Sequence, residues 1–288
     1  MNAKALYVGV LAAAMCAGVV RAEEEEARPM MRNFDRFELD TGTVHGFWLE
    51  VQTFYDAKSG MRALDTATFR NRVNPPPTGS PFGTRGRTVE LDTVRFESRL
   101  VGGGKNVEAG VIIPYVFVEE DGTGHDQSNV GDVRVYLKVV PIRTKWVDAG
   151  FGYDISSESG DHSEGFGYGA VGHLPFGTAT GHLGPVDLNV HFGHRFLNKH
   201  TSDPGESWVY GTSAHCSILD NLSARIEFAG QTFRQGTNFD SLAIEPGVDF
   251  TIPLGPVALM LRPTFSVGLN DDTSDWGAGG SVVLLYGG

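Results

Sequence analysis

The stretch "GDVRVYLKVV" (residues 131–140) decides the fold class, because its residues alternate in character along the chain. Successive side chains of a β-strand point to opposite faces of the sheet. One face of this stretch carries aliphatic residues, namely Val133, Val135, Leu137 and Val139. The other face carries polar or charged residues, namely Asp132, Arg134, Tyr136 and Lys138. The pattern predicts a strand in a soluble sheet packed on a core, or in a barrel whose outer face meets lipid.

Residues 1–22 have the organisation of a secretory signal peptide. Lys4 supplies the positive charge, residues 6–20 form the apolar segment, and residues 20–22 place small residues at the spacing of a cleavage site. We therefore expect export and cleavage after residue 22; a lipoprotein anchored at Cys16 is the less favoured alternative, because a bulky methionine precedes it. Export would leave Cys216 as the single cysteine, so we expect no internal disulfide.

The overall composition allows a membrane barrel and argues against a helical membrane protein. The chain has 288 residues, with 38 glycines, 10% aromatic residues and a mean hydropathy of −0.14. Beyond the N-terminus there is no run of about eighteen apolar residues, the minimum for a membrane-spanning helix. The strands of a membrane barrel, in contrast, average to near-neutral hydropathy. The formal net charge of −12 argues against nucleic acid as a partner.

We expect residues 23–43 to form a polar, periplasmic N-terminal lead-in. After it, segments of alternating character recur with the length that a tilted strand needs to cross a membrane. About twelve strands are expected: residues 47–55, 91–101, 106–118, 131–140, 146–155, 166–176, 186–196, 208–218, 222–233, 242–252, 257–269 and 276–286. No segment has a helical period. The links between these strands largely alternate between long and short, from about thirty residues containing "NPPPTGSPFG" to the short "GGGK".

This alternation favours a barrel, because such barrels have long loops outside and short turns in the periplasm. A two-sheet sandwich has no reason to alternate its links in this way. Trp146, Trp208 and Trp276 stand at strand starts, and Tyr55 and Tyr153 stand near strand ends, where aromatic girdles meet the membrane surface. We therefore predict an all-β, antiparallel, up-and-down transmembrane β-barrel of about twelve strands over residues 44–288, in the outer membrane of a Gram-negative bacterium.

Three short motifs carry a resemblance to a known family. They are "GDVRVYLK" (residues 131–138), "GFGYDISSESGD" (residues 150–161) and "GLNDDTSDWGAG" (residues 268–279). In this order and spacing, the chain from residue 107 onward resembles the outer-membrane barrels named for the meta-cleavage pathway of phenol degradation. The resemblance implies a membrane channel and names no particular solute. It also implies insertion by the barrel-assembly machinery, which reads a terminal aromatic residue; here Tyr286 precedes two glycines.

Charged residues on the inward face of the expected strands are the candidate site residues. A lipid-facing Arg or Lys in mid-membrane would cost about 2–4 kcal/mol, so we expect these charges to line the lumen. The pore-lining candidates are Arg95, Glu97, Arg99, Asp132, Arg134, Lys138, Asp187, Arg195, Arg225 and Glu227. They could form a mixed-charge pore that orients a solute, or cross-strand ion pairs that only fill the interior. The sequence leaves both interpretations open.

The predicted function is a porin-like channel for passive passage of small molecules, which the family resemblance extends to hydrophobic compounds. One alternative is a closed, non-conducting barrel with a structural or surface-interaction role. A third is an outer-membrane hydrolase that uses His162 and Ser163, or Ser213 and His215. The long first loop, residues 58–87, could fold inward and narrow the pore.

No cofactor or metal is expected. "GYGAVG" (residues 167–172) matches a dinucleotide fingerprint, but neither a hydrophobic strand before it nor a helix after it is expected. His191 and His194 lie three residues apart in a strand, so they point to opposite faces and cannot share a metal ion. The expected partners are outer-membrane lipid and lipopolysaccharide. The acidic loops at residues 119–126 and 156–164 could recruit divalent cations that bridge lipopolysaccharide, although a solvated acidic loop is the default interpretation.

Overall fold

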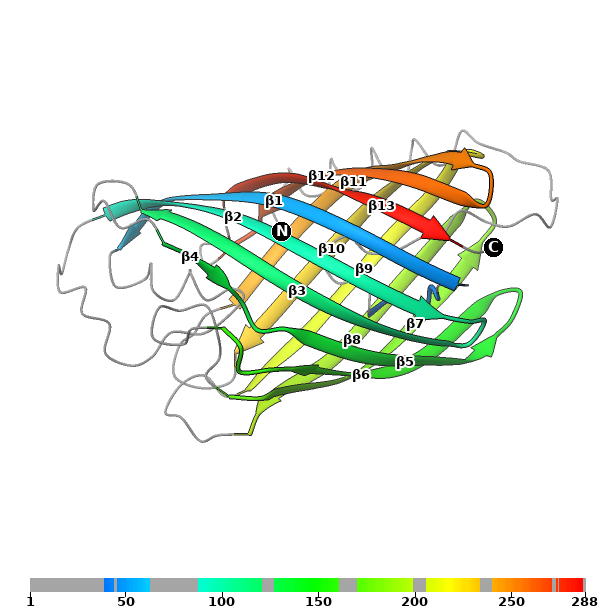
Figure 1. Cartoon of the computed structure of the whole chain (residues 1–288), viewed down its shortest axis with the longest axis horizontal. Coiled ribbons are helices and arrows are strands. Elements are labelled where there is room, and N and C mark those ends of the chain that lie inside the picture. Colours follow the sequence, from blue (N-terminus) through cyan, green and yellow to red (C-terminus); the bar gives the residue numbers. More distant parts are fainter. Residues whose placement is uncertain are drawn as a thin grey trace.

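The computed structural model describes residues 39–43, 46–62, 88–120, 127–160, 170–198, 206–233, 240–270, 273 and 275–286 (Figure 1). Its regular elements in this part of the chain are β1 (Gly46–Arg62), β2 (Thr88–Gly103), β3 (Val107–Glu120), β4 (Gln127–Val130), β5 (Arg134–Arg143), β6 (Val147–Ser156), β7 (Gly172–Leu183), β8 (Val186–Leu197), β9 (Glu206–Leu219), β10 (Leu222–Phe233), β11 (Asp240–Leu254), β12 (Val257–Gly268) and β13 (Trp276–Tyr286). Over the same residues, the model contains no helix with the length and apolar character needed to span a membrane.

The strands close into a barrel. β1 pairs antiparallel with β2 on one side and with β13 on the other, where Phe47 stands opposite Tyr286. β2 pairs with β3, β3 pairs with β5, and from β5 to β13 each strand pairs with the next. β4 pairs with β3 alone, so the closed ring contains twelve antiparallel strands (Figure 1). The predicted fold class and strand number are therefore confirmed.

Short turns gather at one end of this barrel. Residues 104–106, 144–146, 184–185, 220–221 and 255–256 connect consecutive strands there, and β1 begins and β13 ends at the same end. Two of these turns contain a glycine with positive φ, Gly184 (65°) and Gly255 (74°), a conformation that suits a two-residue hairpin turn. We call this the short-turn end. The longer connections lie at the opposite, long-loop end.

The strand expected at residues 131–140 begins later than the alternation indicates. β4 pairs with the Tyr115–Val118 part of β3, and β5 pairs with its Val107–Ile112 part. Residues 131–133 leave the ladder between them, opposite Pro114, which has no N–H to donate. The buried carboxylate of Asp132 instead accepts a hydrogen bond from the Gly160 N–H at 2.9 Å. Residues 131–133 stay attached to both sides, because the Gly131 N–H donates to the Pro114 carbonyl oxygen at 3.0 Å and the Val133 carbonyl oxygen accepts from the Ser157 N–H at 2.8 Å.

Within β5 the two faces differ as the alternation predicts. Val135 and Leu137 are each 51% exposed, whereas Tyr136 is 1% exposed and Lys138 is fully buried. Among the described residues, large apolar side chains are exposed on every strand of the closed ring except β10, and Trp146 is exposed in the turn before β6. Such a continuous apolar exterior around a polar interior is the arrangement of a barrel that spans a membrane.

A β-bulge changes the phase of β5 near its end. The register with β6 shifts between Val139 and Ile142, next to Pro141, which cannot donate to the ladder. Val140 is buried, as alternation predicts, but Ile142, which alternation would place inside, is exposed as a result of the bulge. Arg143 then falls on the inner face, where it contacts the interior of the barrel. Strict alternation from residue 131 does not predict this position.

The interior near the short-turn end contains an apolar cluster in addition to polar side chains. Its buried members come from six strands and are Trp48, Val101, Ile112, Tyr136, Met260 and Val283. Tyr136 reaches this cluster by lying over Gly110, where an added Cβ would be 2.4 Å from the ring carbon Cε1. The tyrosine hydroxyl donates a hydrogen bond to Glu108 Oε1 at 2.8 Å. The core of the molecule is therefore the barrel interior itself.

Candidate functional site

All ten charges predicted to line the pore belong to the described part of the chain. Seven are buried, namely Glu97, Arg99, Asp132, Lys138, Asp187, Arg225 and Glu227. Three are partly exposed, namely Arg95, Arg134 and Arg195. Their burial agrees with an inward orientation in a barrel whose outer face is apolar. Contact with a passing solute remains a prediction for each of them.

Several of these charges meet in one ion-pair network on β1 and β2. Arg99 donates to Glu97 Oε2 through Nη2 at 2.7 Å and through Nε at 3.1 Å. Its Nη1 lies 3.4 Å from Glu50 Oε2. Arg95 also contacts Glu97, with Nε 3.5 Å from Oε1, and its guanidinium lies over the ring of Phe54. The three predicted residues are thus joined through Glu97, and Glu50, which was not predicted, extends the network from Arg99.

The network continues across β12, β11 and β10. Arg262 Nη1 lies 3.7 Å from Glu50 Oε1, and Arg262 Nε lies 3.2 Å from Asp249 Oδ1. Arg225 Nε contacts the same Asp249 oxygen at 3.3 Å, and Arg225 also donates to the Thr264 hydroxyl. We call the six residues Glu97, Arg99, Glu50, Arg262, Asp249 and Arg225 the charge belt.

The charge belt alternates acidic and basic groups, and this arrangement makes its burial tolerable. An isolated charge moved from water into a protein interior costs several kcal/mol, and a counter-ion offsets this cost only where the geometry is good and further hydrogen bonds are made. In the belt each arginine contacts at least one carboxylate, and both Glu50 and Asp249 are shared between two arginines. Glu227 and Glu245 lie beside it as cross-strand neighbours on β10 and β11. The belt is therefore a coupled unit in which no member is independent.

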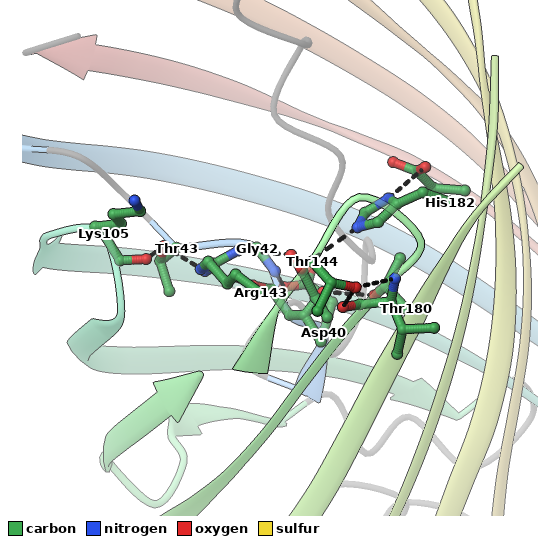
Figure 2. A network of polar contacts seen from close by, with 12 residues as sticks. Asp40, Gly42, Thr43, Lys105, Arg143, Thr144, Thr180 and His182 are labelled. Carbon is green, nitrogen blue, oxygen red and sulfur yellow. Dashed lines mark hydrogen bonds and ion pairs between the residues drawn. The ribbon is translucent and has the colours of Figure 1, made fainter. Parts of the chain in front are cut away.

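A second polar network involves residues 39–43, which precede β1 and lie inside the barrel (Figure 2). Lys138 Nζ is 3.3 Å from Asp40 Oδ1 and 3.3 Å from Glu108 Oε1, and it donates to the Gly42 carbonyl oxygen at 2.5 Å. The Thr41 and Thr180 hydroxyl oxygens are 2.5 Å apart. The expected lead-in over residues 23–43 is described only for these last residues, and they contact the inner faces of β5 and β7.

Arg143 ties this segment to a group of acidic residues near the short-turn end. Its Nη2 donates to the Thr41 carbonyl oxygen at 3.1 Å and to the Thr43 hydroxyl at 2.9 Å, while Nη1 donates to Asp148 Oδ2 at 2.7 Å. His182 stands between two carboxylates, with Nδ1 2.8 Å from Asp187 and Nε2 3.5 Å from Asp148. Figure 2 shows Arg143 and Thr180 beside the segment and His182 farther along β7. Of this group only Asp187 was predicted.

The remaining predicted charges lie toward the long-loop end. Arg134 forms an ion pair with the buried carboxylate of Asp154 on the neighbouring strand β6. The Asp132 carboxylate accepts a hydrogen bond from the Gly160 N–H, as described above. Arg195 is partly exposed on β8, opposite Ser207 of β9. The structure therefore distributes the ten predicted charges among several groups along the lumen and does not gather them at one point.

The missed residues carried different amounts of sequence signal. Glu50, Asp249 and Arg262 obey the same alternation as the predicted charges, so extending the inward parity to every expected strand would have found them. Arg143 follows a bulge, which alternation cannot anticipate. No sequence pattern indicates that Asp40 faces the lumen, because Asp40 precedes the first strand and follows no strand period.

The residues considered for other chemistry are only partly described. His162 and Ser163 lie outside the described residues, as do most of the first loop (residues 58–87) and parts of both acidic loops. Ser213 and His215 are buried on β9 within the barrel wall. His191 is buried, whereas His194 packs against Trp208 with ring centroids 4.3 Å apart. The two histidines thus face opposite sides of β8, as their spacing predicts.

Comparisons with known proteins show the fold alone. No protein-family model and no curated protein matches the chain. An outer membrane channel from Pseudomonas putida F1 is similar at 10% identity and a TM-score of 0.64, with 88% of this chain and 100% of that chain covered. The translocator domain of the autotransporter NalP from Neisseria meningitidis has 11% identity and a TM-score of 0.47, covering 84% and 88%. The toluene transporter TodX from Pseudomonas putida has 10% identity and a TM-score of 0.40, covering 84% and 89%. The chain therefore has the barrel fold of an outer membrane channel, and the family suggested by its motifs stays a prediction.

Proposed function

We propose that this protein is an outer-membrane channel for the passive passage of small molecules, exported by a cleaved signal peptide. Its apolar exterior suits lipid, and its interior carries many buried charges, as expected of a barrel with a polar lumen. We propose no catalytic role for these charges. The solved channel from Pseudomonas putida F1 supports the proposal through its fold.

One observation carries the channel proposal further than the fold does. Every ion pair of the charge belt joins residues on the same strand, on adjacent strands, or on strands with one strand between them. The belt therefore follows the barrel wall. None of these pairs bridges opposite walls, so the belt does not by itself close the lumen.

The family resemblance and the interior apolar side chains favour solutes with an apolar part. Inner faces of outer-membrane barrels are generally polar. Here buried apolar residues such as Tyr136, Ile112 and Met260 share the interior with the charge belt. A solute that carries both an apolar body and a polar group would find partners for each along this lumen.

The competing proposal is a closed barrel with a structural or surface-interaction role. It is favoured by the same apolar cluster near the short-turn end and by residues 39–43, which together occupy part of the interior. The two proposals differ in whether the barrel conducts.

The test is reconstitution of refolded protein in planar lipid bilayers, with swelling of solute-loaded liposomes as a second measurement. A channel predicts discrete conductance steps and solute-size-dependent swelling. A matched variant, Glu50→Gln, should change the ratio of cation to anion permeability, because it removes one charge from the wall. Absence of both conductance and swelling in correctly folded protein would refute the channel and favour the closed barrel.

A further inference from the structure

We propose that the lumen wall contains a binding site for a divalent cation of the calcium type, formed by side-chain oxygen atoms on four adjacent strands. The four residues are Asn189 of β8, Ser213 of β9, Glu227 of β10 and Glu245 of β11, and we call them the oxygen row. The site adds a ligand to the barrel and does not depend on whether the barrel conducts. It follows from the register of the strands, from the charges beside the row and from a buried acceptor that receives no hydrogen bond.

The register of the sheet places the four residues next to one another. Asn189 stands opposite Ser213, Ser213 stands opposite Glu227, and Glu227 stands opposite Glu245. All four are between 1% and 8% exposed, on the polar inner face of the wall. Directly opposed residues have Cβ atoms about 4.5–5.5 Å apart. Because the wall curves around the lumen, inward side chains converge, so the oxygen atoms of the row can approach one ion.

Glu227 and Glu245 form a pair of like charges on neighbouring strands, an arrangement that is destabilising when the two residues are directly opposed. Arg225 stands two residues from Glu227 on the same face, and its guanidinium pairs with Asp249. Together with Arg95 and these two glutamates, the charge belt contains four arginines and five carboxylates. This part of the lumen therefore has more negative than positive charge, and a bound cation would balance it.

Asn189 gives an independent indication of a ligand. Its Nδ2 donates to the Ala179 carbonyl oxygen at 3.2 Å and to the hydroxyls of Thr178 and Thr180 at 3.1 and 3.0 Å, all on β7. A carbonyl oxygen only accepts, so the contact with Ala179 fixes the orientation of the amide. Asn189 Oδ1 is therefore directed away from β7 and toward the rest of the row. This oxygen is buried and has no hydrogen-bond partner, which is costly for a carbonyl group.

The other oxygen atoms of the row are also shielded from solvent, as Glu227 Oε1 and Glu245 Oε2 show. A buried carboxylate requires a close counter-charge. A Ca²⁺ ion lies 2.3–2.6 Å from its oxygen ligands, closer than the roughly 2.7–2.8 Å of a hydrogen bond between two oxygens. The row therefore suits an ion that gives up its water molecules, which Mg²⁺ does reluctantly.

The donor set indicates the chemical class of the ion. Carboxylate, amide carbonyl and hydroxyl oxygens are ligands of hard cations, and two carboxylates match a charge of 2+. If both glutamates bind through both of their oxygens, the row supplies about the six ligand atoms that Ca²⁺ requires at minimum. Among the described residues, no three His, Cys, Asp or Glu side chains form a group that could hold a metal ion. The site therefore depends on Asn189 and Ser213 in addition to the two glutamates.

Binding of radioactive calcium tests the site directly. Full-length protein is refolded in phosphatidylcholine vesicles without lipopolysaccharide, treated with EDTA and dialysed against ⁴⁵Ca²⁺ at physiological ionic strength. Wild type should bind Ca²⁺ saturably. Glu245→Gln should raise the Kd by about thirtyfold or more, because it removes one of two carboxylates, and Asn189→Ala by about fivefold. Glu158→Gln removes the same charge from an exposed loop position, so this matched control should leave the Kd unchanged.

Urea unfolding in the same vesicles gives a second measurement. Ca²⁺ should raise the midpoint of wild type, because a ligand that binds only the folded state stabilises it. Glu245→Gln relieves the repulsion with Glu227, so in EDTA its midpoint should exceed that of wild type, and Ca²⁺ should not raise it further. A glutamate that serves only as an ion-pair partner predicts the opposite, a lower midpoint for the variant in EDTA. Glu227→Gln provides the same comparison if Glu245→Gln fails to fold.

The site is refuted if wild type binds no saturable Ca²⁺, if Glu245→Gln binds Ca²⁺ as tightly as wild type, or if Glu158→Gln loses as much affinity as Glu245→Gln. The first result, with a wild-type midpoint that rises on acidification, would assign a shared proton to the glutamate pair in place of a cation. Bilayer conductance separates this inference from the channel function. A barrel that conducts without binding calcium overturns only the site, and a barrel that binds calcium without conducting overturns only the channel.

Discussion

Lys138 Nζ lies 3.3 Å from Asp40 Oδ1, and 98 residues of sequence separate the two. Lys138 stands in the middle of β5, on the inner face of the stretch whose alternation indicates the barrel. Asp40 belongs to the segment that precedes β1. This contact joins the barrel wall to residues 39–43, so the two must be considered together in any account of conductance.

Neutralising Asp40 should increase conduction. Asp40→Asn replaces a charge-assisted contact with a neutral one, which weakens the attachment of residues 39–43 to the barrel wall by about 1–2 kcal/mol. Because Lys138 keeps Glu108 as a partner, the barrel itself should unfold at the same urea concentration as wild type. Single-channel recording should show a higher open probability. Asp220→Asn, in the exposed turn between β9 and β10, is the control and should leave gating unchanged. An unaltered open probability in Asp40→Asn would contradict the role of the contact.

Breaking the charge belt should destabilise the barrel. Arg99→Met takes the closest cation from Glu50 and Glu97, which keep only the longer contacts to Arg262 at 3.7 Å and Arg95 at 3.5 Å, so the loss should approach the roughly 3–5 kcal/mol of a broken buried pair without exceeding it. Urea titration of the protein in lipid vesicles measures this as a lower midpoint. The double variant Arg99→Met with Glu97→Gln should recover part of the lost stability, because Glu97, the carboxylate closest to the lost guanidinium, is then replaced by a neutral amide. Equal midpoints for wild type and Arg99→Met would show that the belt contributes nothing to stability.

The barrel fold and the inner faces of its strands could be predicted from the sequence, because both depend on short-range periodicity. Alternation with period two assigns Tyr136 and Lys138 to one face and Leu137 to the other, and the structure agrees. The alternation of long and short links correctly indicated a closed antiparallel ring. These features require no knowledge of which distant residues meet.

The missed features depend on local irregularity or on contacts between distant residues. Arg143 reaches the lumen because the bulge beside Pro141 changes the phase of β5, and a bulge has no periodic signal. Asp40 reaches Lys138 from a segment without strand character, so no pattern connects the two. Periodicity likewise shows that charges face inward without showing which ones pair, as in the contact between Arg262 and Glu50.

The glycine beneath Tyr136 offers a test of interior packing. An added Cβ at Gly110 would meet three atoms of the Tyr136 side chain at 2.4–2.8 Å. Gly110→Ala should therefore destabilise the barrel by about 1–3 kcal/mol, the usual cost of overpacking. Tyr136→Leu in the same protein should relieve the clash, so the two changes should be non-additive in urea titration. Gly177→Ala is the control, since nothing lies within 4 Å of an added Cβ there. Simple additivity of the double variant would rule out the clash.

The outer face of the opening stretch can be tested with a single charge. Leu137 is 51% exposed on β5, and its neighbours Val135 and Val139 continue the same apolar face. If this face meets hydrocarbon, Leu137→Arg should lower the free energy of unfolding in vesicles by about 2–4 kcal/mol, the cost of an arginine near the bilayer midplane. Asn106→Arg, in an exposed turn at the short-turn end, should have little effect, because the headgroup region tolerates the charge. In detergent-free aqueous refolding a soluble sheet would accept both substitutions equally. Equal stabilities of the two variants in vesicles would therefore place Leu137 against water and overturn the membrane-spanning barrel.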